Sequence, residues 1–169
     1  MKLFIALLIT IICISACSKS DAAIDVSSQN YVDYSGNFLG STGSGAASGN
    51  DFTSLEIALF NNFDTADLSI YTKPDSVYNT IIFPNPSSSQ VILFCTFNAD
   101  FSDSILVKYV ITDNSLRSVY RSSGVISGSN RFGNINPSIP IGKYRLFVTL
   151  SAKGNDNFYT YWVNITRQN

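Results

Sequence analysis

Two neighbouring segments near the end of the chain place an apolar residue at every second position. These positions are Tyr144, Leu146, Val148 and Leu150 in the first segment, and Tyr159, Tyr161, Val163 and Ile165 in the second. Successive side chains of a β-strand point to opposite faces of a sheet, so the alternation predicts two half-buried strands. Residues 153–156, which read Lys-Gly-Asn-Asp, favour a turn between them. We therefore expect an antiparallel hairpin here.

Similar segments recur along the rest of the chain. Residues 105–112 alternate in the same way, and Asp113, Asn114 and Ser115 then predict a turn into a partner strand that reaches Arg121. Residues 90–97 are apolar on both faces, as expected of a central strand. Short strands are also expected at 68–72, 80–83 and 131–135, whereas 54–59 fits either a strand or a helix. Because no long amphipathic helix separates these segments, we predict an all-β fold, an antiparallel β-sandwich.

The corner that precedes one of these strands narrows the prediction. Residues 140–144 read Pro-Ile-Gly-Lys-Tyr, which resembles the tyrosine corner of immunoglobulin-like and fibronectin-type domains. The resemblance implies that the ring of Tyr144 packs inside while its hydroxyl bonds to the backbone of the corner. We therefore expect an immunoglobulin-like β-sandwich in which Tyr144 has a structural role.

A different pattern opens the chain. Lys2 is followed by an apolar run from Leu3 to Ile14, and then by the small residues Ser15 and Ala16. The run is shorter than the roughly 20 apolar residues that a membrane-spanning helix needs. A positive residue, a short apolar run and small residues are typical of a secretion signal. Residues 1–16 are therefore predicted to be a signal peptide.

The end of this signal resembles the lipobox of bacterial lipoproteins. Ile14, Ser15, Ala16 and Cys17 provide the aliphatic residue, the two small residues and the cysteine of that motif. The resemblance implies cleavage before Cys17, diacylglycerol on its sulfur and acylation of the new amine. Several acyl chains anchor firmly, since each buried CH₂ contributes about 0.8 kcal/mol. The expected location is the cell envelope, anchored by lipid in the outer membrane, on either its periplasmic or its surface side; an ordinary secretory signal with a chance cysteine is the alternative.

The residues after Cys17 suggest how the chain is divided. A run rich in Gly and Ser over 40–49 has no core to bury, and we expect residues 17–50 to form a lipidated N-terminus and a flexible tether. Within it, residues 22–26 and 31–34 are compatible with a short strand. Residues 51–169 are then expected to form the sandwich domain.

Composition argues against catalysis and against nucleic-acid binding. The chain has no His and a formal net charge of −1, with no basic run. A hydrolase usually needs a His base or a close pair of carboxylates, and nucleic-acid binding needs a basic patch. On the lipobox resemblance, Cys13 would leave with the signal and Cys17 would be acylated. Cys95 would then stand alone in an apolar strand and is most simply a buried small hydrophobe. We expect no enzyme activity, no catalytic residues, no cofactor and no metal site.

Two sets of residues are candidate sites. Thr65, Ser76 and Ser104 each follow an Asp and precede an apolar or small residue, which resembles the O-glycosylation motif of some envelope proteins. Phe158 and Trp162 share one face of the last predicted strand and are candidate glycan-contact aromatics, because an exposed aromatic pair suggests binding. Core packing is the competing interpretation of that pair.

The second half of the chain also resembles the C-terminal sorting domain of type IX secretion cargo. The resemblance covers residues 77–165 and includes a strand that ends in Phe83-Pro84-Asn85-Pro86, a hairpin, a corner with Gly142 and Tyr144, and two last strands. It implies a small immunoglobulin-like sandwich, with residues 77–169 acting as a sorting domain.

Taken together, these patterns predict a lipid-anchored envelope protein. Its non-enzymatic β-sandwich is expected to bind a protein or glycan partner or to serve envelope structure, with the membrane reached through the N-terminal lipid. The alternative is a type IX secretion cargo, and a hydrolase is a third class. The sequence does not identify the ligand.

Overall fold

The computed structural model describes residues 23–43, 46–48, 52–63, 68–98, 103–127, 130–153 and 155–169. It contains ten strands in three antiparallel sheets and one short α-helix among these residues. The elements of the N-terminal part are β1 (Gln29–Val32), β2 (Phe38–Thr42), β3 (Ala46–Ser48), α2 (Ser54–Ala58) and the 3₁₀ turn η1 (Leu68–Ile70). The remaining strands are β4 (Val77–Phe83), β5 (Val91–Phe97), β6 (Ser104–Thr112), β7 (Ser118–Ser127), β8 (Asn130–Ile135), β9 (Gly142–Ala152) and β10 (Asn155–Arg167).

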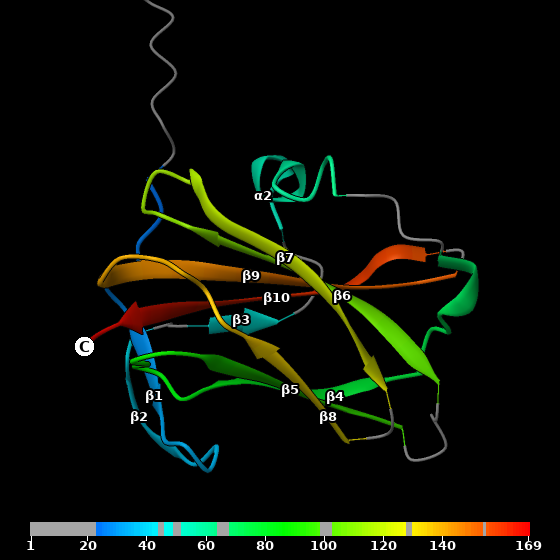
Figure 1. The fold of residues 1–169 in the computed structure, drawn as a ribbon, viewed down its shortest axis with the longest axis horizontal. Helices are drawn as coiled ribbons and strands as arrows, with labels where there is room; N and C mark the ends of the chain where they lie inside the picture. The colour runs from blue at the N-terminus through cyan, green and yellow to red at the C-terminus, as the bar shows by residue number, and fades with distance from the viewer. Residues whose placement is uncertain are drawn as a thin grey trace, which may run out of the picture.

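The predicted all-β fold, an antiparallel sandwich, is confirmed. One sheet has the order β4-β5-β8, and the facing sheet has the order β3-β10-β9-β6-β7. Figure 1 shows the two sheets as separate layers, with α2 beyond the five-stranded sheet and the two-stranded β1-β2 hairpin at the other end of the molecule. The two predicted hairpins are both present, since β6 pairs with β7 and β9 pairs with β10.

The main core lies between the two sheets. Strand β5 alternates strictly, with its buried residues facing the core. These residues are Val91, Leu93, Cys95 and Phe97. They meet inward side chains of β6, β9 and β10, among them Val107, Leu146 and Val163. The alternation of period two therefore decides which face of each strand is buried.

Strands β6 and β9 are buried on both faces, not on one as the sequence predicts. The reason is that residues 52–63 and 68–71 cover the outer face of the five-stranded sheet. Phe52 packs edge-on against Phe147 with a centroid separation of 5.3 Å, and Phe60 is buried beside them. Tyr71 is buried in one hydrophobic cluster with Leu106 and Ala152. Helix α2 lies in this covering part of the chain, so residues 54–59, which fitted either a strand or a helix, begin as a helix. The strand expected at 68–72 is wrong, because the chain forms the 3₁₀ turn η1 there.

The tyrosine corner has the expected geometry. The hydroxyl of Tyr144 donates a hydrogen bond to the carbonyl oxygen of Pro140 at 3.0 Å, and the side chain is buried. A Cβ atom at Gly142 would lie 3.2 Å from the Tyr144 ring, a tight contact that would require the ring to shift slightly. The structural role predicted for Tyr144 is confirmed.

The tether expected up to residue 50 does not match the structure. β1 and β2 form a hairpin within it, and β3 pairs with β10 as the edge of the larger sheet. Gln29 and Val32 are buried, and an isolated bridge joins Val32 to Asn85. Described residues well before residue 51 therefore already belong to the fold. Hydrogen bonds to distant residues order this polar segment, which lacks the apolar alternation of a strand.

Candidate binding surface

The base of the β1-β2 hairpin is held by a buried amide, Asn85. Its Nδ2 atom donates to the carbonyl oxygens of Asn30 and Asn164, both at 2.8 Å. Its Oδ1 atom accepts from Nε2 of Gln29 at 3.0 Å and from the backbone N–H of Thr166 at 3.1 Å. All four hydrogen-bonding positions of the amide are used, which is what a buried polar group requires.

A second buried amide, Asn164, holds the chain just before β1. Its Nδ2 atom donates to the carbonyl oxygens of Asp25 and Ser28 at 3.0 and 2.7 Å, and its Oδ1 atom accepts from Nε of Arg145 at 2.8 Å. Arg145 also donates to the Asp25 carbonyl at 2.6 Å, and burial lowers the pKa of its guanidinium. We call Gln29, Asn85, Arg145, Asn164 and Thr166 the polar base.

The other end of the hairpin, residues 33–39, is here called the hairpin tip. Oδ1 of Asp33 accepts from the backbone N–H groups of Ser35 and Asn37, both at 2.8 Å, and Oδ2 accepts from Nδ2 of Asn37 at 2.9 Å. These bonds, that from the Asn37 side chain first, lower the pKa of Asp33. Gly36 has a φ of +81°, which a side chain disfavours. The tip is therefore a fixed turn.

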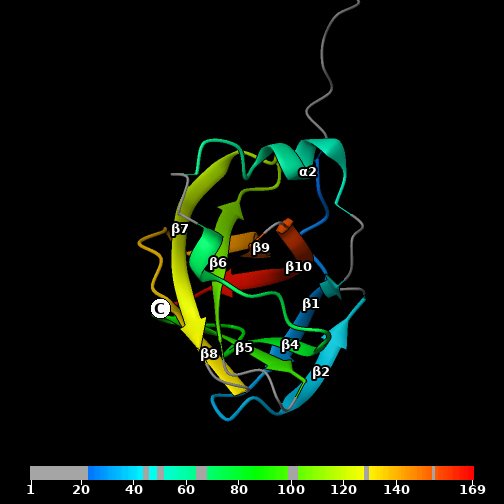
Figure 2. The same cartoon turned by 90° about the vertical axis from the view of Figure 1, so that its right-hand side faces the viewer.

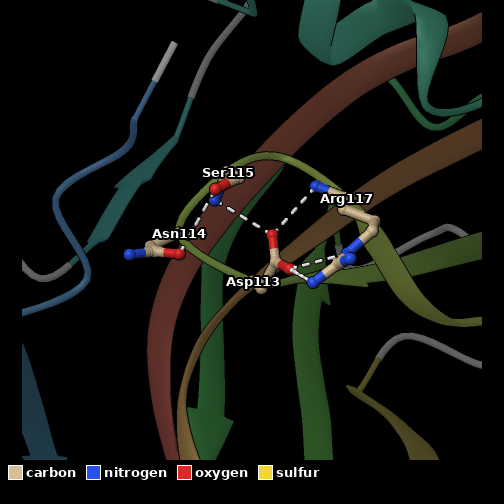
Figure 3. A network of polar contacts seen from close by, with 4 residues as sticks. All are labelled: Asp113, Asn114, Ser115 and Arg117. Carbon is tan, nitrogen blue, oxygen red and sulfur yellow. Dashed lines mark hydrogen bonds and ion pairs between the residues drawn. The ribbon is translucent and has the colours of Figure 1, made fainter. Parts of the chain in front are cut away.

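This fixed turn presents three large apolar side chains to solvent. The relative exposures of Tyr34, Phe38 and Leu39 are 74%, 64% and 68%. Single exposed apolar residues are normal, but several within one ordered turn suggest contact with a partner. The turn of β6 and β7 offers a contrast, because Asp113 there accepts from Ser115 and Arg117 in the same manner but the exposed residues are polar (Figure 3).

A cavity of about 130 Å³ lies beside the tip. Phe38, Val32 and Gly36 of the hairpin line it, with residues of β4 and β10 on the other side. The latter include Thr80, Ile82, Tyr161 and Val163. Ligand pockets for small molecules usually measure 300–1,000 Å³, whereas a dry apolar cavity of about 150 Å³ holds one benzene ring. The cavity is therefore the size of one apolar side chain.

Phe158 and Trp162 do not form an open pair. Trp162 is half-buried beneath the guanidinium of Arg145, whose carbon lies 3.8 Å from the ring centroid. Phe158 is also half-buried, and the ammonium of Lys73 lies 5.8 Å from its ring centroid. Both rings pack at the edges of hydrophobic clusters. The structure thus places both rings within packed surroundings, and glycan contact by them remains a prediction.

The other candidate residues are dispersed. Ser76 is half-buried before β4, and Ser104 opens β6 with its hydroxyl 2.8 Å from that of Ser127. Cys17 and Thr65 lie outside the described residues. Cys95 is buried, as expected, and burial raises the pKa of its thiol to about 12.

Within the described ranges, no group of three or more His, Cys, Asp or Glu side chains lies close enough together to hold a metal ion. In that same part of the chain, no helix is long and apolar enough to cross a membrane.

The hairpin tip was missed in the sequence, although it carries a local signal. Asp33-Tyr34-Ser35-Gly36-Asn37 is turn chemistry between two short runs with β-forming residues, which is typical of a hairpin. The sequence does not show which residues of the polar base bond to one another, because Gln29 and Asn85 lie 56 positions apart.

Comparison with known proteins gives no further assignment. No protein-family model matches the chain, and no curated protein matches it.

Proposed function

We propose that this protein is a lipid-anchored cell-envelope protein whose non-enzymatic sandwich binds a partner protein through the hairpin tip. The observation that carries the proposal is the combination of a fixed turn, three exposed apolar side chains and an adjacent cavity. Protein interfaces depend on a few apolar anchors that fill such pockets. A rigid tip also loses little conformational entropy on binding.

The lipid anchor rests on the lipobox Ile14-Ser15-Ala16-Cys17. A membrane-anchored binding module needs its binding surface on a part of the domain that the anchor leaves free. The chain reaches the sandwich at residues 23–25, next to the polar base, while the tip projects from the far end of the hairpin (Figure 1). This arrangement supports an anchor and a binding surface on different parts of one domain.

The experiment compares the wild-type chain with Cys17→Ser in the native membrane and with Phe38→Ser in the acylated form. The wild type is expected in the membrane fraction with a mass that starts at acylated Cys17, and Cys17→Ser is expected to lose both. A partner protein crosslinked to the wild type should be lost from Phe38→Ser and kept by a matched exposed change, Val125→Ser. Binding of a glycan that persists in Phe38→Ser would contradict the hairpin as the site.

A second candidate is the type IX sorting domain over residues 77–169. One observation favours it: β4 to β10, which span 77–167, supply all strands of the sandwich except β3. Against it, the polar base ties residues 25–30 to that unit through Asn85 and Asn164. Fusion of residues 77–169 to a periplasmic reporter in a type IX host would decide, since surface delivery with removal of the tail supports sorting and retention in the periplasm contradicts it.

A further inference from the structure

Helix α2 displays two aliphatic side chains to solvent. Leu55 and Ile57 are 60% and 51% exposed. The helix is nonetheless fixed, because Thr53 and Glu56 form a capping box at its start, with Thr53 N–H donating to Oε2 of Glu56 at 2.8 Å. Below it, Phe52 and Phe60 stack with centroids 6.0 Å apart. Two apolar side chains are thus held outward on a short rigid element.

The N-terminal chain reaches the sandwich on this same face. Ile24 donates its backbone N–H to the Asn114 carbonyl at 2.8 Å. Its side chain packs in one cluster with Phe52, Leu59 and Phe63, the residues that flank α2. Ile24 and α2 therefore share the outer face of the five-stranded sheet, and Figure 2 shows α2 at the end of the molecule opposite the β1-β2 turn.

The chain length from the anchor limits how far this face is from the bilayer. Six peptide links separate Cys17 from Ala23. Even fully extended, such a length spans only about 20 Å, at roughly 3.3–3.6 Å per residue. If Cys17 carries the lipid, the face that bears α2 must lie close to the membrane.

Cationic side chains accompany the two aliphatic ones. Arg121 of β7 donates a hydrogen bond to the carbonyl oxygen of Asn61 at 2.6 Å. Its guanidinium carbon lies 4.5 Å from the ring centroid of Phe63. Asn61 and Phe63 both follow α2 closely in the chain. Arg117, in the turn that holds Ile24, is mostly exposed, although Asp113 pairs with it at 2.8 Å. Exposed aliphatic residues next to arginines are typical of elements that lie in the membrane interface.

We propose that α2 rests on the bilayer in which Cys17 is anchored, with Leu55 and Ile57 inserted into its interfacial region. This inference rests on the proposed lipid anchor. The inserted helix would hold the sandwich with its five-stranded sheet toward the membrane and the hairpin tip away from it. The acyl chains attach the protein to the membrane, and the short helix sets the orientation of the domain on it.

The test uses the full acylated chain in vesicles of phosphatidylethanolamine and phosphatidylglycerol. An environment-sensitive fluorophore is attached through Ile57→Cys in one sample and through Leu39→Cys, on the hairpin tip, in the other. Acylated Cys17 has no free thiol, and buried Cys95 resists labelling. We expect a shift to shorter emission wavelength and quenching by lipid-borne nitroxides at position 57, and neither at position 39.

Flotation of the vesicles separates the two ways of failing. Protein that floats but shows no quenching at position 57, or more at position 39, overturns the role of α2 and leaves the anchor standing. Protein that carries no lipid and does not float overturns the anchor and this inference with it. In the double variant Leu55→Ser with Ile57→Cys, the quenching at position 57 should fall while flotation stays unchanged.

Discussion

The two ends of the β1-β2 hairpin distribute polar and apolar side chains in opposite ways. At the base, the amides of Gln29 and Asn85 are buried and fully hydrogen-bonded. At the tip, Phe38 and Leu39 are exposed to solvent. Buried polar groups stabilise only when every partner is in place, whereas exposed apolar groups contribute little to folding. The comparison suggests that the base fixes the hairpin and that the tip is free to bind.

Removal of Asn85 is expected to have the largest effect. Asn85→Ala leaves Nε2 of Gln29 and the N–H of Thr166 without an acceptor, and an unsatisfied buried group costs roughly 1–3 kcal/mol. We expect the free energy of unfolding to fall by about 3 kcal/mol for the two groups together. Chemical denaturation measures this, with the exposed Asn79→Ala as the control. An equal, small change in both variants would show that the base does not hold the hairpin.

A backbone change at the tip is expected to have an intermediate effect. Gly36→Ala places a side chain at a φ of +81°, which costs roughly 1 kcal/mol. Space does not limit it, because the new Cβ would lie 3.6 Å from the Phe83 ring. Gly124→Ala is the matched control, since nothing lies within 4 Å of its Cβ. Denaturation curves that coincide for the two variants would contradict a fixed tip.

Changes to the exposed apolar side chains should separate binding from stability. Phe38→Ser and Leu39→Ser are each expected to alter the free energy of unfolding by less than about 0.5 kcal/mol, as exposed substitutions do. Each should weaken partner binding strongly, while Val125→Ser on β7 leaves it unchanged. Thermal unfolding and binding are measured on the same samples. Destabilisation comparable to that of Asn85→Ala would assign these side chains to the fold.

The smallest expected effect is on the pH response of the tip. Hydrogen bonds to the charged carboxylate lower the pKa of Asp33 below its usual 3.8. A lowered pKa in the folded state stabilises the turn above the unfolded value, and this contribution is lost as the pH falls through the folded value. NMR titration should give an Asp33 midpoint below 3.8, and Asp33→Asn should remove the pH dependence of the Ser35 and Asn37 amide shifts. A midpoint at or above 3.8 would contradict the network.

Much of the sandwich is predictable because its signals are local. The alternation around Leu146 and Val163 decides which faces are buried, and the corner at Tyr144 carries its own turn chemistry. The covering of β6 and β9 by residues 52–63 and 68–71 is harder to predict, because the sequence does not show which sheet Phe52 and Phe60 cover.

The polar contacts that fix the hairpin on the sandwich are not predictable from the sequence. Their stability comes from pairs far apart in the chain, such as Arg145 with Asp25 and Asn85 with Gln29. A segment with polar residues buried and apolar residues exposed also inverts the pattern used to predict strands. For this reason the sequence predicts a tether over residues 17–50, with no more than a short strand at 22–26 and 31–34.

The most direct measurement is site-specific photocrosslinking of the acylated protein in its native cells. Benzoylphenylalanine replaces Phe38 in one strain and the exposed Val125 in another. The account predicts a discrete crosslinked protein from position 38 that position 125 does not give and that excess soluble Cys17→Ser protein removes by competition. Absence of a crosslink at position 38, or the same products from both positions, would contradict the hairpin tip as the binding surface.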